Sequence, residues 1–425
     1  MNNQHSFTAV VERMLPEGEA LARTPTGDYY RVRHAVPADK VSLSPLKKRR
    51  GIAYAKLEKV LQASPHRVDP ACPVAARCGG CALQYVQANA QASIKSAWVK
   101  HAFSPVFHHE TDWQAVVHRP FDKVTQRRRV RWQVCVDELG VHLGFFAHQS
   151  HAVVTTPYCM VLTEVLNRLR QALEVCFSVS PEHAPESVYA VQLHDGVHLV
   201  LTYEKKIDAD IFSLPQSLSM PVQYWQRCGL SLKPISYPIR LLSDILPTSK
   251  TVIALNIGPD DFVQGQRLGN ESMIQQVLTW SKGATRVVDL FSGVGNLSLP
   301  LAASGMRVLG AEVNTASVRA ANSNAKRLNL DAHYEQADLF KNFDVSGFVG
   351  ADVLLIDPPR KGARNICRLL PRLMPQCVIF IHCDVNSAHV DALEMLKQGY
   401  RLKALRALDL FPYSGHVESM SLWER

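Results

Sequence analysis

The chain has 425 residues, of which 47% are hydrophobic and 20% charged, and its formal charge is +9. That length exceeds one ordinary hydrophobic core, so we expect two or three domains. Ten cysteines are too few for a disulfide scaffold in a chain of this length. The first residues lack a secretory signal pattern, and no apolar stretch approaches membrane-spanning length. We therefore expect a cytoplasmic protein with no membrane partner, and the positive charge favours a polyanion such as nucleic acid.

The first 62 residues predict a small β-barrel. Short segments of alternating character, at residues 7–14 and 28–36, are separated by turn residues. Several short strands in so few residues are typical of the oligonucleotide-binding barrel. The run from Lys47 to Arg50, followed by Tyr54, would give this barrel positive charge for phosphate contacts. A solvated charged loop is an equally good interpretation of that run.

Three cysteines stand close together and a fourth lies far downstream. Cys72, Cys78 and Cys81 follow the spacing C-x5-C-x2-C, and the distant residue is Cys159. Soft sulfur ligands select iron–sulfur clusters or zinc. The glycine pair before Cys81 leaves little bulk between two thiols, so the backbone can fold tightly around a cuboidal cluster. The pattern predicts one metal centre that holds an iron–sulfur cluster, and zinc is the alternative metal for these four thiols.

Residues 63–262 predict a central domain of mixed helices and strands that contains the cysteine run. A helix is expected over residues 90–105, and strands recur at 127–136 and 197–204. We expect residues of about 93–125 to pack on the domain that follows. A second basic cluster stands in this part of the chain and consists of Arg127, Arg128, Arg129 and Arg131.

Residues 263–425 predict a doubly wound α/β domain. Short apolar runs at residues 286–291, 307–312, 351–359 and 377–383 alternate with segments of helical character. Strands that alternate with helices indicate a parallel sheet with helices on both faces. In such sheets the ligand site lies at the carboxyl ends of the strands.

A glycine-rich turn and two acids that follow the next strands indicate a nucleotide-type cofactor in this domain. The turn from Asp289 to Asn296 joins a strand to a helix, where glycines let the backbone approach a ligand. Glu312 ends the next strand, where a carboxylate can accept hydrogen bonds from ribose hydroxyls. Asp338 follows the third strand and could meet the adenine edge. Because the turn has no phosphate-binding lysine, S-adenosylmethionine suits the site better than NAD or ATP. Helix caps or surface charges are the alternative for each acid.

The same sheet edge receives candidate reacting groups. The segment from Asp357 to Gly362, with sequence DPPRKG, follows a buried strand, and Cys383 follows the next one. His416 and Glu418 come near the end of the chain.

Taken together, these motifs resemble the uracil-C5 RNA methyltransferase family, which forms 5-methyluridine from S-adenosylmethionine. The resemblance spans nearly the whole chain, through the TRAM-type barrel, CGGC, DLFSGVGN, DPPRKG and the FP…HVE ending. It is closest to the iron–sulfur branch that acts on 23S ribosomal RNA. It implies a TRAM barrel, a central RNA-binding domain with a 4Fe-4S cluster, and a Rossmann-like catalytic domain. We expect a monomer. Transfer RNA as substrate and a catalytically weak ribosomal RNA-binding relative remain the alternatives.

The resemblance also implies roles for individual positions. It makes Cys383 the nucleophile and Glu418 the general base. The implied cluster ligands are Cys72, Cys78, Cys81 and Cys159. The implied cofactor contacts are Gln264, Phe291, Asn296, Glu312, Asp338 and Asp357. A cluster with four protein thiolates leaves no open iron for S-adenosylmethionine, which argues against a radical enzyme.

The chemistry explains why these residue types are needed. Uracil C5 is a poor nucleophile, and a thiolate that adds at C6 places electron density on C5. After methylation a base must remove the C5 proton before the thiolate can leave. The target base must be unpaired or flipped out of the stack.

The sequence departs from the family pattern in three motifs. Around Cys383 the sequence is HCDV where SCNP is usual, Ser292 replaces a common cysteine and Gln266 replaces an asparagine. His382 would either assist ionisation of Cys383 or simply pack.

Overall fold

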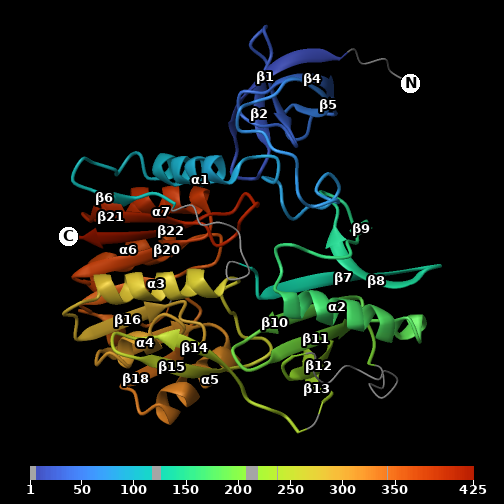
Figure 1. The fold of residues 1–425 in the computed structure, drawn as a ribbon. Helices are drawn as coiled ribbons and strands as arrows, with labels where there is room; N and C mark the ends of the chain where they lie inside the picture. The colour runs from blue at the N-terminus through green and yellow to red at the C-terminus, as the bar shows by residue number, and fades with distance from the viewer. Residues whose placement is uncertain (1–5, 117–125, 207–218, 237, 342) are drawn as a thin grey trace.

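Four β-sheets organise the part of the chain that the structure describes (Figure 1). The structure is a computed structural model, and it describes residues 6–116, 126–206, 219–236, 238–341 and 343–425. The predictions for residues 1–5 of the barrel and for 117–125 lie outside these ranges.

The N-terminal strands close into a five-stranded barrel, in the order β1-β2-β3-β5-β4. Alternate residues of β1, such as Ala9 and Val11, point into the barrel core while their neighbours face solvent. This alternation is the pattern that predicted the barrel, and the prediction is confirmed. The strands are β1 (Phe7–Met14), β2 (Ala20–Arg23), β3 (Tyr29–Val32), β4 (Lys40–Pro45) and β5 (Tyr54–Gln62).

The central part of the chain forms a seven-stranded sheet in the order β13-β12-β11-β10-β7-β8-β9. Its helix α2 (Glu164–Phe177) begins at Thr163, whose side chain accepts a hydrogen bond from Leu166 N. The apolar side of α2 packs with Trp132 and other strand residues in one core. The strands are β7 (Arg129–Asp137), β8 (Gly140–Phe146), β9 (Val153–Val154), β10 (Ser187–Gln192), β11 (Val197–Tyr203), β12 (Val222–Cys228) and β13 (Ser231–Pro234), and a short 3-10 helix covers Pro181–His183.

The C-terminal sheet has eight strands in the order β18-β17-β16-β19-β20-β22-β21-β6. The five strands from β18 to β20 pair in parallel, and β22 then runs antiparallel to β20. This is the doubly wound arrangement that the alternating runs predicted. The strands are β6 (Asp112–Gln114), β16 (Arg286–Leu290), β17 (Arg307–Glu312), β18 (Ala332–Gln336), β19 (Val353–Ile356), β20 (Cys377–His382), β21 (Arg401–Leu408) and β22 (Glu418–Glu424).

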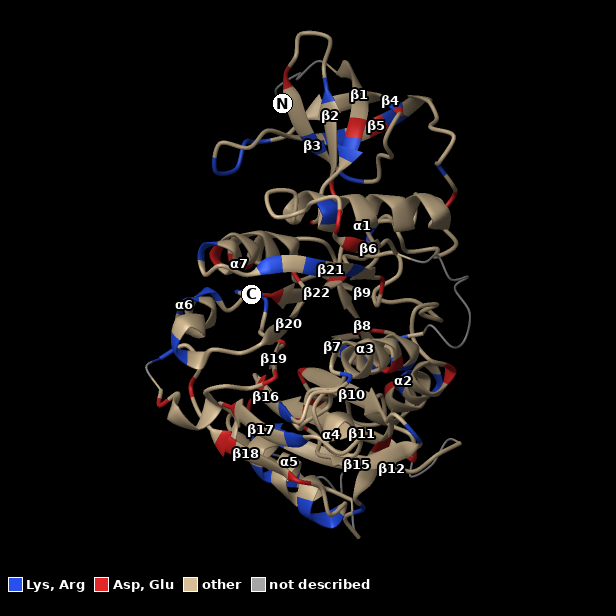
Figure 2. Cartoon of the chain, turned by 90° about the vertical axis from the view of Figure 1, so that its left-hand side faces the viewer, with Lys and Arg blue, Asp and Glu red and all other residues tan. Residues whose placement is uncertain are grey.

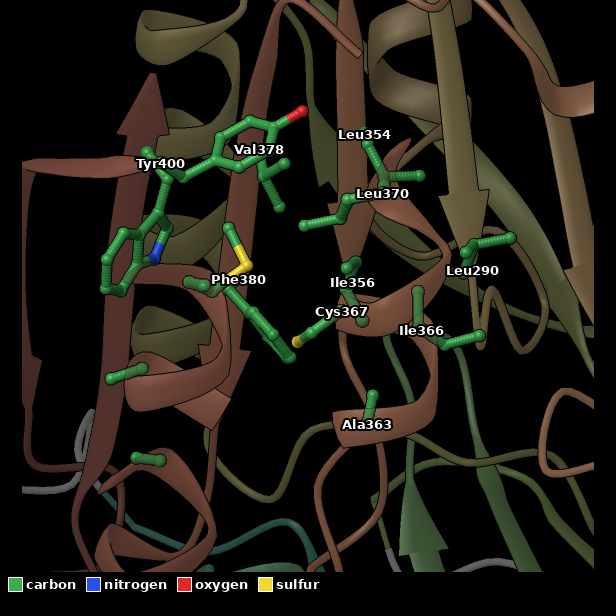
Figure 3. Packing of buried hydrophobic residues seen from close by; sticks show 14 of the residues in the cluster. Leu290, Leu354, Ile356, Ala363, Ile366, Cys367, Leu370, Val378, Phe380 and Tyr400 are labelled. Atoms are coloured by element: carbon green, nitrogen blue, oxygen red, sulfur yellow. The ribbon is translucent and has the colours of Figure 1, made fainter. Parts of the chain in front are cut away.

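Helices cover both faces of this sheet, so a central strand such as β19 is apolar and buried along its whole length. On β19, Leu354 and Ile356 face one core, while Val353 and Leu355 face the other. The first core, drawn in Figure 3, contains Cys367 fully buried among aliphatic and aromatic side chains. Its helices are α1 (Ala88–Ala102), α6 (Arg364–Leu373) and α7 (Val385–Lys397); those of the second core are α3 (Arg267–Trp280), α4 (Leu299–Ala302) and α5 (Thr315–Arg327), and a 3-10 turn spans Ser346–Phe348.

Two segments outside residues 263–425 contribute to this unit. The strand β6 pairs in parallel with β21, and α1 contacts α7. The hairpin of β14 (Leu242–Pro247) and β15 (Val252–Ile257) packs in the second core. The domain boundaries at 62 and 262 stay a prediction. Helix α1, strand β6 and the β14–β15 hairpin precede residue 263 in the sequence but pack with the C-terminal sheet.

Candidate active site and cysteine cavity

The carboxyl ends of five neighbouring parallel strands bring most of the predicted site residues to one edge of the sheet. Phe291 follows β16 and Glu312 ends β17. Asp338 comes shortly after β18, Asp357 directly after β19, and Cys383 directly after β20. Because these strands are adjacent in the sheet, residues nearly one hundred positions apart lie along the same edge, formed by the carboxyl ends of the strands. We call this edge the lip.

Strand register places Glu418 opposite Cys383. In the antiparallel pair β20–β22, Ile381 lies opposite Met420 and His382 opposite Ser419. The pairing ends there, and Cys383 and Glu418 are the next residues along the two chain segments. They lie close enough that, after burial, the charge of Glu418 is the next cause that raises the pKa of the Cys383 thiol. The sheet therefore joins the predicted nucleophile and base, although 35 positions separate them in the sequence.

Burial and mutual repulsion set the electrostatics of this group. Burial, together with the charge of Asp357, raises the pKa of Glu418 to about 8, and burial raises that of Asp357 to about 7. Burial raises the pKa of the Cys383 thiol to about 12, with further contributions from Glu418 and Asp357. Arg360 opposes these shifts for Cys383 and Glu418. The lip thus holds three acidic groups that cannot all ionise without added positive charge.

Arg360 is fixed near these groups by a residue of the C-terminal loop. Its Nη2 lies 3.1 Å from Nε2 and 3.2 Å from Nδ1 of His416. Burial, and then the charge of Arg360, lowers the pKa of His416 to about 4, so this imidazole is neutral at physiological pH. A neutral imidazole can contact the guanidinium without repelling it.

The glycine-rich turn has the backbone geometry of a ligand cradle. Phe291 adopts a left-handed conformation with φ of 67°, which costs free energy in a non-glycine residue. Gly293 N donates to Glu312 Oε2 over 3.1 Å, so the acid is held against the turn. Asn296 exchanges two amide hydrogen bonds with Asn270 of α3, of 2.8 and 2.9 Å. Asn270 is a candidate neighbour of the cofactor that sequence analysis missed.

Two of the predicted cofactor residues are placed differently from the rest. Asp338 accepts from Phe340 N over 3.1 Å and pairs with Lys341 over 3.2 Å, which leaves it at the rim. Gln264 is buried on the segment between β15 and α3, and its carbonyl accepts from Arg128 Nε over 3.0 Å. The backbone of Gln264 is therefore held by Arg128, the residue directly before β7 of the seven-stranded sheet.

His382 packs away from the thiol that it precedes. Its Nε2 lies 3.1 Å from Asp391 Oδ2 on α7, and its ring stacks on Phe380 with centroids 4.1 Å apart. Asp391 also accepts from Ala363 N over 2.9 Å. Of the two interpretations of His382, this geometry favours packing, because the pair anchors the segment that follows Asp357.

The four predicted cluster ligands line one cavity of about 260 Å³. Cys72, Cys78 and Cys81 enter from the cysteine loop, and Cys159 enters from the segment before α2. Among the described residues, no three His, Cys, Asp or Glu side chains converge tightly enough to hold a single metal ion. The thiols thus surround a space without meeting at a point.

A second cavity, of about 550 Å³, lies between the barrel and residues 148–149. Arg31, Arg33, Lys47, Arg49 and Tyr54 line it. Figure 2 shows further Lys and Arg segments on β21 and α6, so positive charge is found both on the barrel and around the eight-stranded sheet.

In the described part of the chain no helix is both long and apolar enough to span a bilayer.

Comparisons with known proteins decide the family. The family model described as tRNA (Uracil-5-)-methyltransferase matches residues 89–425. The chain belongs to the uracil-C5 RNA methyltransferase family. The predicted membership is confirmed, and with it the enzyme class, a methyltransferase that uses S-adenosylmethionine.

Relatives of this uracil-C5 methyltransferase match along almost its whole length. It is 33% identical over 426 residues to the 23S rRNA (uracil(1939)-C(5))-methyltransferase RlmD of Pseudomonas aeruginosa, covering 97% of this chain and 93% of that one. It is 32% identical over 404 residues to the protein of the same name from Shewanella sediminis, covering 92% and 89%. The Pyrococcus abyssi tRNA (uracil-54, C5)-methyltransferase, solved with S-adenosyl-L-homocysteine, has a TM-score of 0.76 and 18% identity over 98% of this chain and 99% of that one, which shows a common fold.

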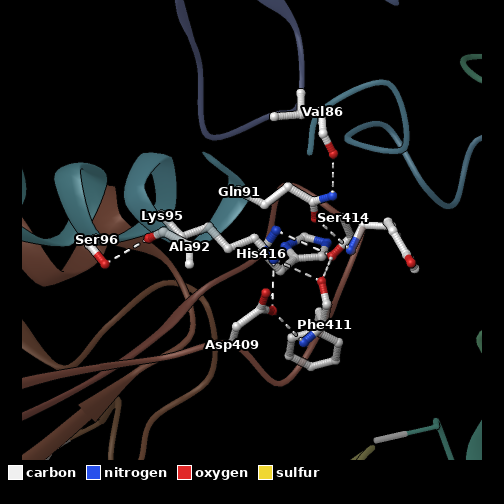
Figure 4. A network of polar contacts seen from close by, with 10 residues as sticks. Val86, Gln91, Ala92, Lys95, Ser96, Asp409, Phe411, Ser414 and His416 are labelled. Carbon is white, nitrogen blue, oxygen red and sulfur yellow. Dashed lines mark hydrogen bonds and ion pairs between the residues drawn. The ribbon is translucent and has the colours of Figure 1, made fainter. Parts of the chain in front are cut away.

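A buried lysine that sequence analysis missed binds the loop before Glu418. Lys95 of α1 is 0% exposed, and its Nζ donates to Asp409 Oδ1 over 2.7 Å and to the Phe411 carbonyl over 2.9 Å (Figure 4). The available signal was the position of Lys95 between Ala92 and Val99 on the apolar side of the helix. A lysine there needs a buried partner.

Proposed function

We propose that this chain methylates C5 of a uridine in 23S ribosomal RNA and forms 5-methyluridine through a covalent bond between Cys383 Sγ and uracil C6. The observation that carries the proposal is the register that sets Cys383 opposite Glu418 at the lip that also holds Glu312 and Asp357. The relatives from Pseudomonas aeruginosa and Shewanella sediminis are named as 23S rRNA (uracil(1939)-C(5))-methyltransferases, which supports that substrate. Its location would then be the cytoplasm.

The proposed reaction uses two acidic groups of the lip, Cys383 and Glu418, in turn. Ionised Cys383 adds to C6, which places negative charge on the ring and makes C5 nucleophilic. S-adenosylmethionine supplies the electrophilic methyl group, and its sulfonium charge favours ionised groups nearby. Glu418 then accepts the C5 proton, the C6–sulfur bond breaks, and the electron pair returns to Cys383. Arg360 stabilises the negative charge of the thiolate.

We assign cofactor contacts to the side chains around the glycine-rich turn. Glu312 would hold the ribose hydroxyls, and Asp338 would stand beside the adenine. Asp357 would lie between the cofactor and the uracil edge. Gln264, Phe291 and Asn296 complete the proposed cradle.

We propose that Cys72, Cys78, Cys81 and Cys159 hold a 4Fe-4S cluster. Two observations support this assignment, and the first of them separates a cluster from zinc. The four thiols surround a cavity instead of a point, and Arg127, which lines that cavity, has guanidinium nitrogens with no acceptor among the described residues. An anionic sulfur-rich cluster would satisfy both. Iron and acid-labile sulfide in equal amounts in an anaerobic preparation would agree; zinc without iron would contradict it.

The substrate test measures tritium transfer from labelled S-adenosylmethionine. We expect transfer to 23S rRNA from cells that lack this enzyme, and none to transfer RNA from the same cells. The variant Cys383→Ala should lose transfer at least about 1,000-fold, because nucleophilic catalysis is removed, while cofactor binding persists. Full activity in that variant would end the proposal. Transfer to tRNA alone would assign the other substrate, and no transfer to either would indicate a binding protein.

A further inference from the structure

Arg127 stands between the cysteine cavity and the loop that leads to Glu418. It lines the cavity together with the four cysteines. On its other side, the guanidinium carbon lies 5.3 Å from the centroid of the Phe411 ring. Arg127 is the first member of the basic cluster, and the proposed reaction leaves it without a role. Its neighbour Arg128 is bound to Asp244 over 2.7 Å.

The guanidinium of Arg127 lacks partners for two of its nitrogens. Nε and Nη2 are buried and find no hydrogen-bond acceptor among the residues that the structure describes. A buried charged donor without an acceptor is costly, so the site needs a further anionic group. Arg127 shares this cavity with the four cysteines, so its positive charge lies beside the sulfur atoms.

The loop that Arg127 contacts is anchored on several sides. Phe411 meets His416 edge to face, with centroids 5.7 Å apart, and His416 contacts Arg360 beside the thiol. The Tyr413 carbonyl accepts from Leu83 N over 2.8 Å, two residues beyond Cys81. The loop therefore has a direct connection to the cysteine run as well as to the catalytic lip.

We propose that Arg127 is a positioning residue: it is the counter-cation of the group held by the four thiolates and, through Phe411, it keeps residues 409–416 in the place that presents Glu418. This inference rests on the proposed iron–sulfur cluster. N–H donors and positive charge near a cluster stabilise its reduced form, which carries one more negative charge. The flat guanidinium can meet this need at its edge while its face rests on the aromatic ring.

The test compares Arg127→Gln, Arg127→Lys and Arg131→Gln in the cluster-containing protein. Arg131 lines the same cavity, but its guanidinium lies 5.3 Å from the Tyr189 ring centroid and away from the loop. Two quantities are measured without any turnover: the midpoint potential of the cluster, by electron paramagnetic resonance during reductive titration, and hydrogen exchange of the amides in residues 409–416.

We expect Arg127→Gln to shift the potential to a more negative value, so that the ratio of reduced to oxidised cluster at a fixed potential falls about tenfold. Amide exchange in residues 409–416 should rise by about the same factor, since the contact with Phe411 is lost. Arg127→Lys should keep the potential, because it keeps the charge, and should still raise exchange. Arg131→Gln should leave loop exchange at its wild-type value and should shift the potential by less than Arg127→Gln does, because its guanidinium stands over the Tyr189 ring.

An unchanged potential and unchanged loop exchange in an iron-replete Arg127→Gln protein would overturn the role of Arg127 and leave the cluster proposal standing. If that variant does not accumulate, wild-type exchange in Arg127→Lys would overturn it equally. A wild-type preparation with no iron or sulfide would overturn the cluster assignment and this inference together.

Discussion

At the scale of single residues, the base Glu418 has the sharpest consequence. It is 5% exposed and begins β22 opposite the proposed nucleophile. In Glu418→Gln the C5 proton cannot be removed, so addition and methylation should proceed and elimination should stop. We expect a covalent protein–RNA species that survives denaturing electrophoresis, and it should vanish in the double variant with Cys383→Ala. A Glu418→Gln protein that turns over at the wild-type rate would contradict the assignment.

The raised pKa of Glu418 also predicts a pH profile. Glu418 accepts a proton only when ionised, and its pKa is raised to about 8. The elimination rate should therefore climb as pH rises from 6, reach half its maximum near pH 8, and level off about one pH unit higher. Asp357→Asn removes a neighbouring negative charge, which lowers the pKa of Glu418 and should move the rising limb to lower pH. Single-turnover rates at saturating cofactor and RNA would show this. The same midpoint in both proteins would contradict it.

At the scale of elements, the segment between β19 and α6 is held by one close approach. Gly362 has φ of 74°, and a Cβ there would lie 2.4 Å from Asp391 Oδ2, the atom that contacts His382. Gly362→Ala should lower the free energy of unfolding by about 3 kcal/mol, since a strained backbone conformation and a clash are combined. It should also reduce methyl transfer, because Asp357 and Arg360 lie on this segment.

A matched control separates these two contributions. Gly399 has a similar φ of 84° but no atom within 4 Å of an added Cβ. Gly399→Ala should therefore cost only the backbone strain, about 1 kcal/mol, with methyl transfer intact. Chemical denaturation of the two variants gives the difference. Equal losses of stability would show that the contact with Asp391 is unimportant.

At the scale of the whole molecule, α1 connects the catalytic sheet to the N-terminal parts. Lys95 binds the loop before Glu418, and Trp98 Nε1 donates to the Met14 carbonyl of the barrel over 2.9 Å. Lys95→Met leaves Asp409, which is 18% exposed, without its cation, and should destabilise the protein by about 3 kcal/mol. Lys100→Met, on the exposed side of α1, loses only the contact of the ammonium with the Phe107 ring and should change stability by less than about 1 kcal/mol. Similar unfolding midpoints for both variants would contradict a structural role for the buried pair.

The sequence by itself determined the elements and the family. Strand alternation predicted the barrel, and apolar runs that alternate with helices predicted the parallel sheet, because both patterns are local consequences of which side of the backbone is buried. Motif spacing identified Cys383, Glu418 and the four cysteines as candidates, although their roles stay proposals. Only the tertiary structure decided which distant residues meet. The pairing of Lys95 with Asp409, of His382 with Asp391 and of Arg127 with Phe411 joins segments whose separation follows no local period. Such contacts depend on how sheets and loops pack, and a buried charge reveals its partner only when the fold brings it there.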